Sequence, residues 1–451
     1  MIVSDSSILV QRPNCTTRKI NGLNTVLDYD NSVLIRFNEV GSLIWDYFHR
    51  PLSVLEVANY ISKSYDVDPE VALSDVIDFI ERYIQENNLF VDPADIKLFE
   101  TKKKSLNDSI YGQLEDLGFE ESVPTMVEIE LTNKCVLRCI HCSVIYDKNR
   151  IGQTNLNKEQ MIQAIDQLER IGCFEITFTG GEIFTRKDAL DIISYADQRG
   201  FAINLLSSAT TLQEEQIRAL ASLRLNNFQV SIYSADPKVH DEVTRVDGSF
   251  ERSMKNIRLL QAQGVHVTLA CVIMKINYPT YQSVKLLADN IGADCTIAYP
   301  IRSRDDGSKD THNLRILEDE LYQLVSDNSS RFCRLHKRDI DAPICHAGRA
   351  IASISSHGDV FPCVLFSLKV GSLLSNSFED IWRNSPELNK FRNLKLRDTY
   401  NCGSCEILEY CPVCPGLSLL EEGDMLLPSN INCTMSKAIY HYFKQKGGEN
   451  E

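Results

Sequence analysis

The chain has 451 residues, of which 43% are hydrophobic and 24% are charged, and its formal net charge is −15. A single hydrophobic core stops growing at roughly 250 to 300 residues, so a chain of this length is expected to fold as two or three domains. The acidic balance argues against nucleic acid as the main partner, because binding to phosphates requires a basic surface. No stretch approaches ~18 consecutive apolar residues and no apolar run follows a basic start, so we expect a cytoplasmic protein that contacts no membrane.

Residues 1–95 predict a small domain of short strands followed by three helices. Hydrophobic residues alternate at 8–12, 18–20, 25–29 and 32–37, and helical periodicity follows at 39–48, 53–65 and 69–88. Ser53 and Asp68 are suitable N-cap residues, and Glu56 completes a capping box with Ser53. This order of elements predicts a winged helix-turn-helix domain. Acidic residues on its helices argue against DNA binding, because a recognition helix needs Lys and Arg.

Strand and helix patterns alternate from residue 126 onward, after a polar segment at 96–124 that is expected to be a linker. Strands are predicted at 126–131, 175–179, 202–206, 228–232, 265–273 and 295–299, with helices at 158–171, 187–199, 214–223, 250–264 and 278–291. This alternation indicates an α/β domain with a parallel sheet, and a partial (β/α)6 barrel over residues 125–335 suits its length. Chemistry in such barrels sits at the C-terminal ends of the strands.

Cys135, Cys139 and Cys142 form a C-x3-C-x2-C triplet directly after the first strand of this predicted barrel. Three thiolates on one tight loop can hold three irons of a [4Fe–4S] cluster and leave the fourth iron open. A zinc knuckle and three buried thiols are the alternatives. The triplet resembles that of the radical S-adenosylmethionine (SAM) enzymes. In that family the open iron binds SAM, and reductive cleavage of SAM yields a 5′-deoxyadenosyl radical that abstracts hydrogen from the substrate.

The resemblance implies further cofactor contacts at the same end of the barrel. The implied residues are His141, Gly180, Gly181, Glu182, Ser207, Ser231 and Arg245. The two glycines and the glutamate after the second strand resemble the family's Gly-Gly-Glu motif, whose backbone and carboxylate bind the ammonium group of SAM. The histidine occupies the position near the adenine, and the two serines lie on segments that face the ribose or the methionine carboxylate. The arginine stands one residue after the position where the family usually has one.

A second group of seven cysteines lies near the C-terminus, and its spacing resembles the SPASM extension of radical SAM enzymes. This extension carries auxiliary iron–sulfur clusters, and it is expected at 336–451. The resemblance implies a distal cluster bound by Cys402, Cys405, Cys411 and Cys433 and a proximal cluster bound by Cys345, Cys363 and Cys414. The proximal cluster is one thiolate short, and Cys333 is the nearest spare cysteine. The expected cofactors are therefore three [4Fe–4S] clusters and S-adenosyl-L-methionine.

The N-terminal domain, placed ahead of such a barrel, resembles the peptide-recognition element of ribosomal-peptide maturation enzymes. In that family the leader of a precursor peptide adds as a strand to the edge of the small sheet. We expect this edge near residues 32–37, and a purely structural role for the domain is the alternative. The implied partners are a ribosomal precursor peptide and an electron donor such as flavodoxin or ferredoxin, with no nucleic acid and no membrane.

Three short motifs, at 179–184, 345–348 and 362–366, resemble the subtilosin-type maturases of sactipeptides and ranthipeptides. Those enzymes form thioether bonds between a cysteine sulfur and a carbon of an acceptor residue. Alternatives inside the class are carbon–carbon cross-linking and anaerobic sulfatase maturation by formylglycine formation, of which the second needs no leader-binding domain. A non-catalytic iron–sulfur scaffold is a further alternative, against which the intact cysteine triplet and Glu182 argue.

Overall fold

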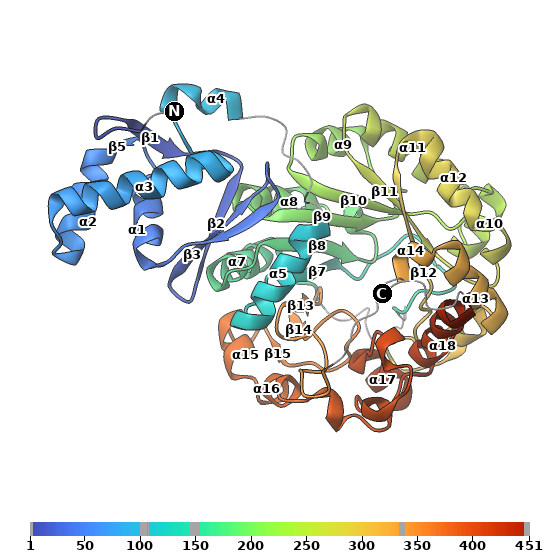
Figure 1. Ribbon diagram of the computed structural model, residues 1–451. Coiled ribbons are helices and arrows are strands. Elements are labelled where there is room, and N and C mark those ends of the chain that lie inside the picture. Colours follow the sequence, from blue (N-terminus) through green and yellow to red (C-terminus); the bar gives the residue numbers. More distant parts are fainter. Residues whose placement is uncertain (1–2, 100–105, 107, 145–153, 333–338, 446–451) are drawn as a thin grey trace.

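The computed structural model describes residues 3–99, 106, 108–144, 154–332 and 339–445 (Figure 1). An N-terminal domain lies beside a central parallel sheet with its helices, and the cysteine-rich C-terminal segment packs below that sheet in the view of Figure 1. None of the helices in the described residues is long and apolar enough to cross a bilayer.

The N-terminal domain contains short strands followed by three main helices, as predicted. Its elements are β1 (Ile8–Gln11), β2 (Cys15–Ile20), β3 (Leu23–Asp28), β4 (Val33–Arg36), α1 (Glu39–Tyr47), β5 (Leu52–Ser53), α2 (Val54–Tyr65), α3 (Pro69–Asn87), β6 (Phe90–Val91) and α4 (Ile96–Phe99). The strands form two small sheets, β2–β3–β4 and β5–β1–β6. α2 begins at the predicted capping box, in which Ser53 and Glu56 each accept a hydrogen bond from the other's backbone amide. The core is aromatic, and Trp45 packs against Phe37 and Phe90 with ring centroids 5.5 Å apart in both pairs.

The segment expected to be a linker contains a packed helix, α5 (Asp108–Glu121). Ile110, Leu114 and Leu117 of this helix are buried in one core with residues of β3 and of the barrel. Their i, i+4, i+7 spacing makes an apolar stripe, although the segment as a whole is polar. α5 therefore joins the N-terminal domain firmly to the barrel.

Six parallel strands stand side by side in chain order, β7 to β12, which confirms the predicted partial barrel. The elements are β7 (Met126–Thr132), α7 (Lys158–Ile171), β8 (Glu175–Gly180), α8 (Ala189–Gln198), β9 (Ala202–Ser207), α9 (Glu214–Ala221), β10 (Leu225–Ser231), α10 (Pro237–Thr244), α11 (Ser249–Ala262), β11 (Val267–Val272), α12 (Gln282–Ile291) and β12 (Asp294–Ala298). On β7, Val127, Ile129 and Leu131 are buried in the hydrophobic core. Glu128 and Glu130 alternate with them and face the inside of the barrel.

The C-terminal segment continues the same sheet. Its elements are α13 (Glu318–Asp327), α14 (Ser329–Phe332), β13 (Ile351–Ile354), β14 (Asp359–Phe361), β15 (Gly371–Ser372), α15 (Phe378–Asn384), α16 (Pro386–Arg392), α17 (Pro415–Glu422) and α18 (Asn430–Gln445). β13 pairs in parallel with β7. β14 pairs antiparallel with β13 and β15 pairs antiparallel with β14, so the sheet has nine strands. This extension of the sheet was not predicted, and it places β13 of the C-terminal segment beside β7, the first strand of the barrel.

Candidate active site

The cysteine triplet lies on the loop after β7, at the C-terminal end of the barrel. Cys135, Cys139 and Cys142 are all partly buried. Burial, followed by the charges of the neighbouring Cys142 and Cys135, raises the pKa of Cys139 to about 12. Leu137 donates its backbone amide to the Cys135 sulfur at 3.4 Å. A donor set of three crowded thiols suits a cationic iron cluster, because a bound metal removes thiol protons and offsets the repulsion.

The cluster loop is held in place by the end of α10. The amide of Arg138 donates to the Thr244 carbonyl and the amide of Ile140 to the Val243 carbonyl, both at 3.0 Å. Arg245, which we expected to contact the cofactor, instead ends α10 in the left-handed conformation (φ 56°) with an exposed side chain. This part of the chain therefore supports the loop through its backbone, and a contact between Arg245 and the cofactor stays a prediction.

The glycine pair after β8 lies directly against the cluster loop. Gly181 donates its amide to the Thr132 carbonyl at 2.8 Å. A Cβ atom on Gly180 would stand 2.3 Å from the Thr132 carbonyl oxygen, and one on Gly181 would stand 2.2 Å from the Lys134 carbonyl oxygen. No side chain fits at either position, and Gly180 also adopts a φ of 138° that favours glycine. The glycines are thus required for the close approach of two backbones.

Glu182 differs from the expectation. Its side chain is completely buried, and its carboxylate accepts hydrogen bonds from the Ser207 hydroxyl at 2.7 Å and from the Ser208 amide at 2.8 Å. The Ser208 hydroxyl also donates to this carboxylate. Glu182 and Ser207 thus bind each other and tie the end of β8 to the end of β9, and their contacts with SAM stay a prediction.

His141 and Ser231 remain at the mouth of the site. Burial lowers the pKa of His141 to about 4, so the imidazole is neutral at physiological pH. Its ring lies edge-on to Tyr233 with centroids 4.9 Å apart. Ser231 is half-buried at the last position of β10 and interacts with the Tyr233 hydroxyl. Both residues therefore lie beside Tyr233, and their contacts with the cofactor stay a prediction.

Three residues that the sequence analysis missed contact the cluster loop. The buried hydroxyl of Tyr233 lies 4.0 Å from the Cys139 sulfur. Arg304 donates to the Cys142 carbonyl at 2.8 Å, and Arg302 donates to the Ser143 hydroxyl at 2.6 Å. The two arginines follow β12, the last strand of the barrel, so this edge strand contributes contacts to the loop. Their position after a barrel strand was the signal that could have identified them.

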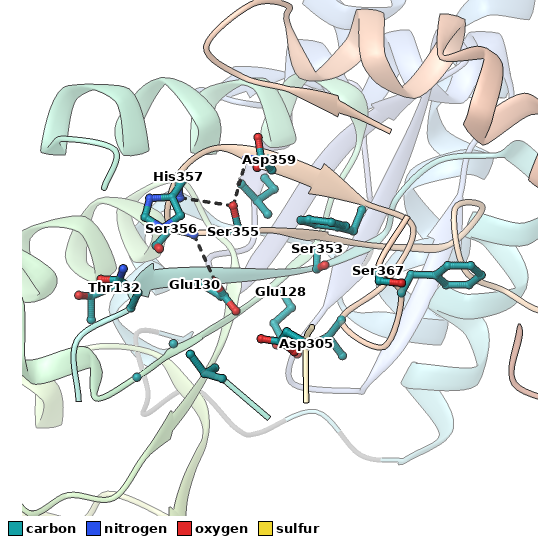
Figure 2. Close-up of a pocket in the computed structure, with 18 of the residues that line it drawn as sticks. Glu128, Glu130, Thr132, Asp305, Ser353, Ser355, Ser356, His357, Asp359 and Ser367 are labelled. Atoms are coloured by element: carbon teal, nitrogen blue, oxygen red, sulfur yellow. Dashed lines mark hydrogen bonds between the residues drawn. The ribbon is translucent and has the colours of Figure 1, made fainter. Parts of the chain in front are cut away.

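A cavity of about 320 Å³ opens beside the cluster loop (Figure 2). One wall is built by Glu128, Glu130 and Thr132 of β7, and Gly180 and Gly181 close the end next to the loop. The C-terminal segment contributes residues of β13 and β14, which continue the sheet beside β7, together with Val364, Phe366 and Ser367, which follow Cys363. The cavity therefore lies between the cysteine triplet and a cysteine of the second group.

The cysteines of the second group interact within each expected set and also between the sets, because Cys414 interacts with Cys411. Cys363 interacts electrostatically with Cys345 and Cys414. Cys402, Cys405, Cys411 and Cys433 interact with one another. Among the described residues, no three His, Cys, Asp or Glu side chains converge tightly enough to hold a single metal ion. Cys333 lies outside the described residues.

Comparison with known protein families matches three parts of the chain. A model of the radical SAM superfamily matches residues 129–287, and a model of the iron–sulfur cluster-binding SPASM domain matches residues 345–412. The chain therefore contains a radical SAM domain and a SPASM domain. A model of coenzyme PQQ synthesis protein D matches residues 25–87, within the N-terminal domain. The matched domains indicate [4Fe–4S] clusters and S-adenosylmethionine as cofactors of this enzyme.

Individual relatives are similar but distant. An AdoMet-dependent heme synthase of Methanosarcina barkeri is 25% identical over 68% of this chain and 95% of the relative. The antilisterial bacteriocin subtilosin biosynthesis protein AlbA of Bacillus subtilis is 27% identical over 65% of this chain and 68% of the relative. The crystal structure of Streptococcus suis SuiB bound to its precursor peptide SuiA has a TM-score of 0.66 at 15% identity, and the match covers 94% of this chain and 99% of SuiB. That structural likeness shows a shared fold.

Proposed function

We propose that this enzyme is a cytoplasmic peptide maturase that installs thioether cross-links in a ribosomally synthesised precursor peptide. The observation that carries the proposal is the position of the cavity, between the cysteine triplet and the segment after Cys363. A substrate in this cavity has the radical source on one side and an auxiliary cluster on the other. The similarity to a subtilosin biosynthesis protein supports a peptide as the substrate.

The residues of the chain have distinct roles in this proposal. Cys135, Cys139 and Cys142 hold the iron–sulfur cluster that cleaves SAM. SAM bound at this cluster supplies the radical. Cys402, Cys405, Cys411 and Cys433 hold a distal auxiliary cluster, and Cys345, Cys363 and Cys414 hold a proximal one. The backbone of Gly180 and Gly181 shapes the SAM site. The Arg302–Ser143 and Arg304–Cys142 contacts keep the loop closed over the cavity. A flavodoxin or ferredoxin supplies electrons.

The leader of the precursor peptide binds at the free edge of β4. Val33, Ile35 and Phe37 turn their amides toward β3, so the amides of Leu34 and Arg36 point outward, as an added strand requires. The amide of Leu34 donates to the side chain of Gln113 on α5 at 3.2 Å. A leader strand must therefore replace this side-chain hydrogen bond with a main-chain one and approach an edge at which Arg36 also pairs with Glu121 of α5.

Mass spectrometry of the precursor after co-expression tests the proposed product. Each thioether removes two hydrogens, consumes one cysteine thiol and resists reducing agents. A two-hydrogen loss with every cysteine still alkylatable would indicate a carbon–carbon bond instead, and conversion of cysteine to formylglycine would indicate the sulfatase-maturase reaction.

Cysteine variants test the division of roles. Cys139→Ala is expected to abolish SAM cleavage, whereas Cys402→Ala is expected to leave cleavage measurable and to prevent product formation. The wild-type enzyme reconstituted with iron and sulfide is expected to hold about twelve irons, as three [4Fe–4S] clusters require. About four irons per chain would contradict the proposed ligands of the second cysteine group.

A further inference from the structure

One carboxylate in the cavity has no structural role. Glu128 projects from the middle of β7 into the cavity, on the same side as Glu130 (Figure 2). Within the described part of the chain, the Glu128 side chain makes no hydrogen bond and no ion pair. Removing a carboxylate from bulk water without giving it a partner costs folding free energy. An unpaired carboxylate at the wall of a cavity therefore indicates a functional role.

The other charged groups of this cavity are engaged. Glu130 accepts a hydrogen bond from the Ser356 amide at 3.4 Å. Asp305 pairs with Arg302 at 3.2 Å. Asp359 pairs with Lys369 at 2.6 Å, and His357 contacts the Thr154 carbonyl at 3.3 Å. Glu128 therefore stands apart as the side chain that is open to a substrate.

We propose that Glu128 is the base that accepts the thiol proton of the substrate cysteine when the cross-link forms. The proposal rests on the thioether-forming function given above. Forming one C–S bond removes a hydrogen atom from carbon, which the 5′-deoxyadenosyl radical takes to become 5′-deoxyadenosine. The thiol gives its proton to Glu128, and one electron passes to an oxidised [4Fe–4S] cluster of the SPASM domain. These transfers account for both hydrogens and for the remaining electron.

The surroundings of Glu128 suit this role. Burial and the charge of Glu130 raise the pKa of Glu128 to about 7, and Arg302 acts in the opposite direction. The other charged or titratable groups lining the cavity are Asp305, His357 and Asp359. A carboxylate with a pKa near 7 is a better base than an ordinary glutamate and is still largely ionised at pH 8. Since the base must be deprotonated, cross-linking should accelerate as the pH rises through about 7.

Glu128→Gln tests the proposal because the amide preserves the shape of the side chain but cannot take a proton. The full-length reconstituted enzyme is assayed with the peptide of an adjacent cysteine-rich reading frame, between about pH 6 and pH 8.5. We expect 5′-deoxyadenosine release within about twofold of wild type and unchanged peptide affinity by fluorescence anisotropy. Thioether formation should fall about 100-fold or more, and its rise through pH ~7 should disappear.

Two variants serve as controls. Glu128→Asp keeps a carboxylate and should retain part of the cross-linking rate together with its pH dependence. Glu175→Gln removes another buried glutamate, at the far end of β8 and outside the cavity, and should leave the pH profile unchanged. Wild-type rate and pH profile in Glu128→Gln would overturn the assignment, as would equal loss of 5′-deoxyadenosine and product. Failure of the wild-type enzyme to form any thioether would instead overturn the proposed function.

Discussion

Glu175, at the start of β8, tests how a buried carboxylate affects the free energy of unfolding of the barrel. Its side chain is 5% exposed, and burial raises its pKa from 4.5 to about 7 despite hydrogen bonding with Tyr111 and Asn204. Between these pKa values the folded protein holds a proton that the unfolded chain releases. Stability contributed by this proton is fully present below pH ~4.5 and is lost as the pH rises through about 7. At about 1.4 kcal/mol per pKa unit, the full shift corresponds to roughly 3 kcal/mol.

Glu175→Gln keeps the shape of the side chain and removes its charge. Relative to wild type, the free energy of unfolding of this variant should increase by about 2 kcal/mol between about pH 5.5 and pH 8. Urea unfolding followed by circular dichroism at the two pH values measures this difference. Glu159→Gln, at an exposed position of α7, is the matched control because it removes no buried charge. The same stability difference at both pH values would refute the reasoning, since the ionised carboxylate would then not be the destabilising group.

Three further substitutions test the site. Gly181→Ala places a methyl group 2.2 Å from the Lys134 carbonyl oxygen, so reconstituted iron should fall by about a third, whereas Gly112→Ala, with open space around it, should retain full iron content. Tyr233→Phe removes a hydroxyl beside the Cys139 sulfur, and redox titration by electron paramagnetic resonance should show a more negative midpoint for the SAM-cleaving cluster. An unchanged midpoint, equal to that of the control Tyr281→Phe, would contradict this. Gln113→Ala frees the Leu34 amide, so its hydrogen exchange should accelerate and leader affinity should rise about fivefold, as one hydrogen bond of about 1 kcal/mol allows. Unchanged exchange would show that this contact does not protect the edge of β4.

Local patterns were sufficient to predict the strands and helices of the barrel and of the N-terminal domain. The alternation on β7 and the capping box at Ser53 are encoded within a few residues, so the sequence reveals them directly. α5 was missed because its apolar stripe lies in a segment of polar composition. β13 was missed because its pairing with β7 joins residues more than 200 positions apart. No local periodicity reports such a partner.

The candidate site could likewise be predicted only where its features are encoded locally in the sequence. Cysteine spacing sufficed to propose the cluster ligands, because three thiols on one short loop are close in any fold. Spacing did not reveal where side chains point, and Glu182 shows the consequence. Its motif marks the correct strand end, yet its carboxylate turns into the protein toward Ser207 and Ser208. Tyr233 and Arg304 reach the loop from the ends of β10 and β12, and only the three-dimensional arrangement of the strands brings them there.

The distant relatives bear on where the outcome of the reaction is decided. A heme synthase and a subtilosin biosynthesis protein both resemble this chain at about a quarter identity, although their names describe different products. A cluster loop that only generates a radical cannot by itself choose the bond that follows. Under the proposed function that choice falls to the groups that line the cavity, which include Glu128 and Glu130 of β7 and Val364, Phe366 and Ser367 of the SPASM domain. Substitutions in this wall should therefore change the product before they change SAM cleavage, whereas substitutions in the cysteine triplet should abolish both.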